Sequence, residues 1–190
     1  MILYFLMRNK DTLQRRINRE AEENALCEEI LRYGDVILRS DVFRQTSAET
    51  HHLHGTLRDH ILNVCIVSVY MSRFETRRGR QIREEDLIRA ALCHDLGMVG
   101  REKKYRNRND SWRLHAEESV RIARELIPDL SGETADMILT HMWPVAGKRP
   151  GSREGMILGA ADKLASIVDW GTWLTGRTFA GHMKEVLLKQ

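Results

Sequence analysis

The chain has 190 residues, 42% of them hydrophobic and 30% charged, and its formal net charge is only +3. This length predicts one domain, the apolar fraction excludes a disordered chain, and the small net charge excludes a protein that wraps a nucleic-acid polymer. The three cysteines form no CxxC pair, which favours a reducing, cytoplasmic compartment. Eight histidines stand out, because histidine is the commonest metal ligand and an acid–base group near neutral pH.

The N-terminal run MILYFLM is much shorter than the roughly 20 apolar residues needed to span a bilayer. Charges follow this run, whereas a signal peptide carries them before its apolar region, so we expect neither a signal peptide nor a membrane partner. Apolar residues three to five apart over 11–33 then predict an amphipathic helix that Gly34 ends. We expect residues 1–38 to be a helical extension that packs on the domain or on a second subunit of a homodimer.

Apolar spacing is helical through the rest of the chain as well. It predicts helices over 57–74, 84–95, 115–127, 131–141, 153–170 and 178–189, with a basic loop over 99–113. The helix over 57–74 is apolar on nearly every side, which predicts a place at the centre of the core. The fold class is therefore all-α, with one domain over 39–176 and a tail or short helix over 177–190.

Four imidazoles and two carboxylates stand at predicted helix ends or on apolar helix faces: His60, His94, Asp95, His115, His141 and Asp162. A carboxylate on an apolar helix is costly to bury without a cation or a donor. Imidazole with carboxylate suits Fe, Mn, Co, Ni or Zn, and six ligands would suit two ions that share a bridging carboxylate. A single histidine such as His60 is as readily explained by a hydrogen bond at the core edge, so the prediction of a metal site depends on the whole set.

The order of these residues resembles the HD-domain superfamily of metal-dependent phosphohydrolases, in particular its two-metal branch. The surrounding segments ALCHDLG, HAEES, THMWP and ADK are similar to a group of small bacterial HD proteins, over about residues 40–175. The resemblance implies an HD-domain helical bundle with an added N-terminal helix. It also implies that His60, His94, Asp95 and Asp162 hold a first ion, that His115 and His141 complete a second, and that Asp95 bridges the two. A metal-bridging hydroxide would then attack phosphorus.

Met98 departs from the patterns of two branches of that superfamily. Cyclic-dinucleotide phosphodiesterases typically have lysine near this position and single-metal nucleotide phosphatases have glutamate there, so neither subclass is implied. The predicted function is hydrolysis of a small phosphorylated substrate, such as a nucleotide or a related phosphoester. Two alternatives use the same residues: a mixed-valence di-iron oxygenase, and a non-catalytic sensor that binds metal and nucleotide.

Residues 99–113 contain six basic and two acidic side chains directly after the His94–Asp95 pair. This segment is either a lid over an anionic substrate or a solvated turn. Candidate substrate contacts are Lys103, Lys104, Arg106 and Arg108, together with Lys163 beside Asp162. Lys163 and His54 are candidate catalytic groups along with Asp95; His54 is either a proton donor in the cleft or a solvated residue at the helix entry.

Overall fold

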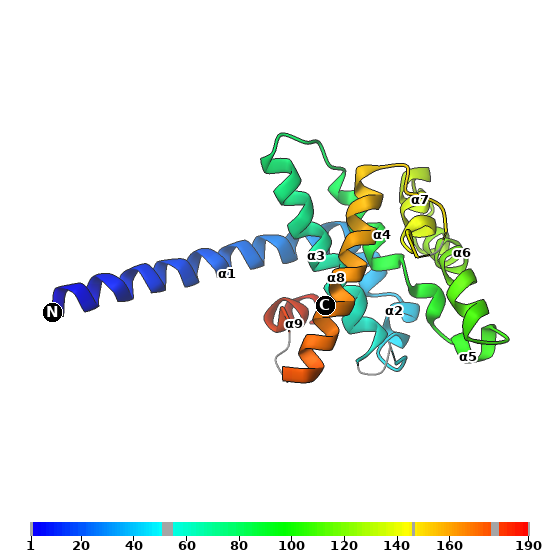
Figure 1. The fold of residues 1–190 in the computed structure, drawn as a ribbon, viewed down its shortest axis with the longest axis horizontal. Coiled ribbons are helices and arrows are strands. Elements are labelled where there is room, and N and C mark those ends of the chain that lie inside the picture. The colour runs from blue at the N-terminus through cyan, green and yellow to red at the C-terminus, as the bar shows by residue number, and fades with distance from the viewer. Residues whose placement is uncertain (1, 51–54, 146, 176–178, 190) are drawn as a thin grey trace.

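The computed structural model describes residues 2–50, 55–145, 147–175 and 179–189, and it confirms the all-α prediction (Figure 1). Within these ranges there is no strand, only an isolated antiparallel bridge between Thr50 and Thr56. The elements are α1 (Ile2–Leu38), α2 (Asp41–Gln45), α3 (Leu57–Arg77), α4 (Glu84–Cys93), the 3₁₀ helix η1 (Leu96–Met98), α5 (Arg101–Lys104), α6 (Arg108–Leu126), α7 (Gly132–Thr140), α8 (Arg153–Thr175) and α9 (Gly181–Leu188).

Helix α3 lies at the centre of the bundle, in contact with α8, α4 and α1 (Figure 1). It begins at Thr56, whose hydroxyl accepts a hydrogen bond from the Asp59 backbone N–H at 3.1 Å. Most of its following three turns are buried, including Ile61, Val64 and Ile66 at 0% exposure. The prediction that this nearly all-round apolar helix forms the centre of the core is confirmed.

Helix α1 does not end at Gly34, as the sequence predicts, but continues to Leu38. A Cβ atom on Gly34 would lie 2.2 Å from Leu92 Cδ1, so this glycine lets α1 approach α4 closely. The N-terminal part of α1 extends away from the bundle, whereas its last turns pack on α4 and α9 (Figure 1). No helix in the described ranges combines the length and the apolar character needed to cross a membrane.

The prediction of a loop over 99–113 is wrong, because much of this segment is helical. Gly100, with a φ of 70°, precedes α5, and α6 begins at Arg108. Asn107 caps α6, since its side-chain oxygen accepts a hydrogen bond from the Asp110 N–H at 3.0 Å. His115 therefore lies about two turns inside α6 and does not open a helix. The run of charges concealed an ordinary capped helix start.

Gly97, which follows the predicted helix over 84–95, joins two elements of the bundle. Helix α4 already ends at Cys93, and Gly97 lies in η1 against α6. A Cβ atom on Gly97 would lie 2.2 Å from the His115 carbonyl oxygen and 2.9 Å from the Ser119 nitrogen. The Gly97 N–H also donates to Ser119 Oγ at 2.8 Å. This backbone-to-backbone contact fixes the segment after His94 and Asp95 directly on the helix that carries His115.

Replacing Gly97 with alanine should therefore separate η1 from α6. We expect Gly97→Ala to lower the free energy of unfolding by at least about 2 kcal/mol, and the melting temperature by roughly 4–8 °C. Gly132→Ala is the matched control, because nothing lies within 4 Å of its added Cβ, and it should be neutral or slightly stabilising. Thermal melts followed by circular dichroism measure both variants. A Gly97→Ala protein as stable as the wild type would contradict this packing.

Candidate metal centre

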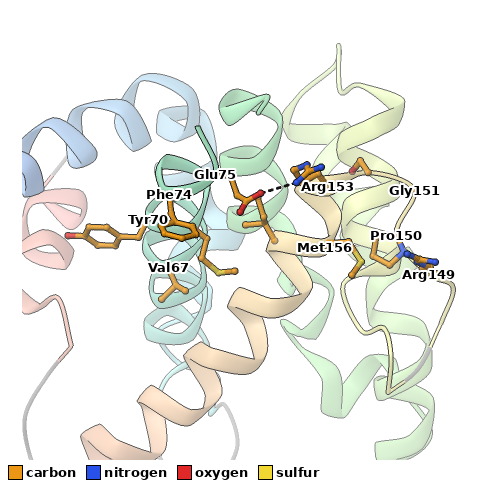
Figure 2. A pocket seen from close by; sticks show the side chains of 12 residues that line it. Val67, Tyr70, Phe74, Glu75, Arg149, Pro150, Gly151, Arg153 and Met156 are labelled. Atoms are coloured by element: carbon orange, nitrogen blue, oxygen red, sulfur yellow. Dashed lines mark hydrogen bonds and ion pairs between the residues drawn. The ribbon is translucent and has the colours of Figure 1, made fainter. Parts of the chain in front are cut away.

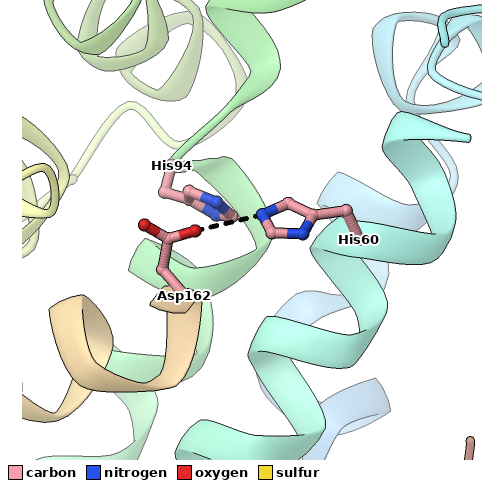
Figure 3. Close-up of side chains that lie close together, drawn as sticks. All are labelled: His60, His94 and Asp162. Carbon is pink, nitrogen blue, oxygen red and sulfur yellow. Dashed lines mark hydrogen bonds and ion pairs between the residues drawn. The ribbon is translucent and has the colours of Figure 1, made fainter. Parts of the chain in front are cut away.

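The bundle brings all six predicted ligands together from five parts of the chain. His60 comes from α3, His94 and Asp95 from the end of α4, His115 from α6, His141 from the end of α7 and Asp162 from α8. The four imidazoles and Asp95 are buried. Figure 3 shows His60 and Asp162 meeting across the gap between α3 and α8, with His94 beside them. Polar side chains gathered in a helical core need partners.

Asp95 lies between two pairs of imidazoles. Its Oδ2 atom is 3.6 Å from His94 Nε2 and 4.0 Å from His60 Nε2. Its Oδ1 atom is 3.3 Å from His115 Nε2 and 3.6 Å from His141 Nε2. Each carboxylate oxygen therefore faces a different histidine pair.

Backbone carbonyls determine how three of the rings are oriented. The Nδ1 atom of His94 lies 2.8 Å from the Ala91 oxygen, that of His115 lies 3.0 Å from the Ser111 oxygen, and that of His141 lies 2.6 Å from the Ile138 oxygen. A carbonyl oxygen only accepts hydrogen bonds, so each Nδ1 carries the proton. In the neutral imidazoles the Nε2 lone pairs are then directed toward Asp95 and toward one another.

The donor atoms fit a bound cation. The buried Nε2 of His94 has no hydrogen-bond partner among the described residues. The Nε2 atoms of His115 and His141 lie only 3.1 Å apart, so two lone pairs face each other when both rings are neutral. Both arrangements are unfavourable in a buried site and become favourable once a cation accepts the lone pairs. In each of two groups of three residues, the possible ligand atoms all lie within 4.8 Å of one another. One group is His60, His94 and Asp162, and the other is His94, Asp95 and His141.

Asp169 is a component of the site that the sequence analysis missed. Its Oδ2 atom accepts a hydrogen bond from His60 Nδ1 at 2.9 Å, and its Oδ1 accepts one from Asn63. A carboxylate behind a metal-binding imidazole fixes the ring and raises its basicity. The available signal was the spacing, because Asp169 follows Asp162 by seven residues and so lies on the same face of α8.

Burial and nearby charges divide the histidines into two kinds. Burial lowers the pKa of His94 to about 4, which keeps this ring in the neutral form that binds metals. Burial also opposes the charge on His60, but hydrogen bonds with Asp162 and Asp169 outweigh it and raise the pKa of His60 to about 10. Burial likewise opposes ionisation of Asp162, yet the His60 hydrogen bond and the neighbouring imidazoles hold the pKa of this carboxyl well below its usual range. The carboxylates of Asp162 and Asp169 therefore favour the protonated form of His60.

The cluster opens into a cavity of about 820 Å³, lined by four of the six residues: Asp95, His115, His141 and Asp162. Lys163 also lines it, and its ammonium donates to Asp162 Oδ2 at 3.0 Å and to the His141 carbonyl oxygen at 2.6 Å. These two bonds hold the Lys163 charge at the cavity wall, next to two of the candidate ligands.

The basic segment contributes unevenly to this cavity. Arg106 lines it, as does Arg101, which the sequence analysis did not select. Lys103 is exposed and Lys104 pairs with Glu118 at 3.2 Å, and neither belongs to the cavity wall. The side chain of Arg108 and the whole of residues 51–54, including His54, lie outside the described residues.

A second cavity of about 980 Å³ lies between α3 and the start of α8 (Figure 2). Its lining is mainly apolar, with Tyr70, Phe74 and Met156 partly exposed, and an ion pair of Glu75 with Arg153 at one end. None of the six candidate ligands lines it. We therefore place the candidate chemistry in the cavity beside Asp95.

Comparison with known proteins gives one match. The family model described as HD domain matches residues 57–167, which is more than half of the chain and includes all six candidate ligands. No curated protein and no solved structure matches the chain. HD domains are typically metal-dependent phosphohydrolases. On this match, together with the helical bundle and the clustered His and Asp residues, the chain belongs to the HD-domain family.

Proposed function

We propose that the protein is a two-metal phosphohydrolase that acts on a small phosphorylated substrate. The observation that carries the proposal is the position of Asp95, whose two oxygens face two different histidine pairs. The second support is the cavity beside it, which Arg101, Arg106 and Lys163 line together with Asp95. A site for cations and a site for an anionic group thus adjoin.

In this proposal His60, His94, Asp95 and Asp162 hold one divalent ion, and Asp95, His115 and His141 hold the other. The ions are Fe, Mn, Co, Ni or Zn, the metals that imidazole and carboxylate donors favour. When bound, such ions make a water molecule more acidic and neutralise the charge that develops on phosphoryl oxygens. The chain's own part is to hold the imidazoles in one tautomer, through the carbonyls of Ala91, Ser111 and Ile138 and the carboxylate of Asp169.

The basic residues of the cavity orient the substrate. The guanidinium groups of Arg101 and Arg106 suit phosphate, since each can donate two parallel hydrogen bonds to it. Lys163 supplies a fixed point charge, because Asp162 and the His141 carbonyl oxygen hold its ammonium in place. These cations would draw a phosphoryl group toward Asp95 and fix its direction relative to the ligands.

The first test removes the charge of Asp95 and keeps its shape. Asp95→Asn should bind at least one metal ion fewer per chain and should release phosphate at least about 100-fold more slowly. A neutral amide lacks the two anionic oxygens with which the carboxylate would bind an ion beside each histidine pair. Elemental analysis and a phosphate assay measure these effects, and circular dichroism checks that the variant is folded. Asp129→Asn is the control, because this aspartate is exposed and does not line the cavity, and it should change neither quantity. A fully metallated and fully active Asp95→Asn protein would refute the assignment.

The second test addresses Asp169, which contacts the candidate ligand His60. Asp169→Asn should weaken metal binding by about 10- to 100-fold, because His60 loses the carboxylate that fixes its ring. Competition with a chromogenic chelator measures the affinity of each metal site. The weaker site should be the one that includes His60, and the affinity of the other should stay within about threefold. Unchanged affinity at both sites would show that Asp169 has no influence on the metal centre.

The reaction itself is tested on protein purified without added metal. We expect two equivalents of a first-row metal per chain, and phosphate release from at least one member of a panel of phosphomonoesters and nucleotides. Two irons with an unpaired-spin signal after partial reduction, and no phosphate release, would contradict the proposal and favour an oxygenase. Tight nucleotide binding by the metallated protein without any product would instead favour a sensor.

A further inference from the structure

The cavity beside Asp95 has an apolar wall that phosphate chemistry alone does not require. Five large apolar or aromatic side chains line it: Met98, Tyr105, Trp112, Met142 and Val145. Of the candidate ligands in the cavity, Asp95, His115 and His141 are buried and Asp162 is partly buried. Trp112 and Val145, by contrast, are 44% and 61% exposed. The ligands therefore form the inner end of the cavity, and these two apolar side chains lie at its mouth.

Trp112 stands close to the candidate metal centre along α6. It precedes His115 by three residues, so the two side chains lie on the same side of the helix with Cβ atoms about 5–6 Å apart. An aromatic ring joined to a phosphoryl group through one ester oxygen or a short linker would span this separation. A large, half-exposed indole in a cavity wall is a surface on which such a ring can stack.

The other lining residues agree with this division of the cavity. Tyr105 donates its hydroxyl to the Gly97 carbonyl oxygen at 3.0 Å, so its polar group is satisfied and its ring serves as wall. Apart from the candidate ligands, Glu102 is the only carboxylate that lines the cavity among the described residues, against the cations of Arg101, Arg106 and Lys163. The cavity thus combines cationic side chains that suit an anionic group with an apolar surface.

On the basis of the proposed function, we propose that the substrate is a phosphomonoester that carries an aromatic ring, attached directly or through a short linker, and that this ring stacks on Trp112. The residue then determines specificity, because it favours a flat aromatic group over an aliphatic group of the same size. The volume of about 820 Å³ is within the range of pockets that enclose a whole small molecule, which leaves room for the ring as well as for the phosphate.

The test compares phenylphosphonate with cyclohexylphosphonate, which share the charged group and the number of ring carbons. Calorimetric titration of the full-length, metal-loaded protein should show about 5- to 10-fold tighter binding of the phenyl compound. Trp112→Ala should reduce this ratio to about one, and Trp112→Phe should keep most of it. Leu114→Ala is the matched control, because Leu114 is 43% exposed on the same helix and does not line the cavity; it should leave the ratio unchanged.

A second measurement compares the kcat/KM values of phenyl phosphate and cyclohexyl phosphate, and those of adenosine 5′-monophosphate and ribose 5-phosphate. If Trp112→Ala removes the preference for phenyl phosphate, the ring of the substrate is attached directly to the phosphate. If it removes the preference for adenosine 5′-monophosphate, the ring is attached through a pentose, and either result supports the proposal. Equal binding of the two phosphonates, or a ratio that Trp112→Ala leaves unchanged, would overturn it. Phosphate release without an aromatic preference would overturn this inference alone, whereas aromatic binding without any phosphate release would overturn only the proposed hydrolase function.

Discussion

One carboxylate, Asp95, lies within 4.0 Å of the Nε2 atoms of all four clustered imidazoles. Burying so many polar groups in a helical core is unfavourable unless each finds a partner. The Nδ1 atoms find theirs in backbone carbonyls and in Asp169, which leaves the Nε2 atoms directed inward. The unpartnered Nε2 of His94 and the facing Nε2 atoms of His115 and His141 then make a cation the natural occupant of the centre.

The packing of the helices holds these side chains in position. Glycines permit two close approaches: Gly34 brings α1 onto Leu92 of α4, and Gly97 brings η1 onto the backbone of α6. The second contact is the more consequential, because η1 directly follows His94 and Asp95 while α6 carries His115. The position of Asp95 between two histidine pairs thus depends on a packing contact that only a residue without a side chain allows.

The sequence predicted the helical class and the central helix, because helical periodicity is a local signal. Residue type singled out His60, His94, Asp95, His115, His141 and Asp162, and the resemblance to the HD-domain superfamily implied that they form one site. The match of residues 57–167 to the HD domain agrees with this fold and shows the family. What the sequence missed depends on tertiary contacts. Gly34 continues a helix because Leu92 packs on it, and Asp169 matters because α3 places His60 beside it. The helix start at Asn107 was a local signal, hidden in a run of charges.

The most direct test is a crystal structure of the metal-loaded protein, with diffraction data collected at the absorption edge of the metal that elemental analysis identifies. Anomalous scattering locates each ion independently of its assumed ligands. The account predicts two peaks about 3.5–4 Å apart on either side of Asp95, one beside His60 and His94 and one beside His115 and His141. A single peak that Asp95 does not contact, or metal bound outside this cluster alone, would contradict the central claim.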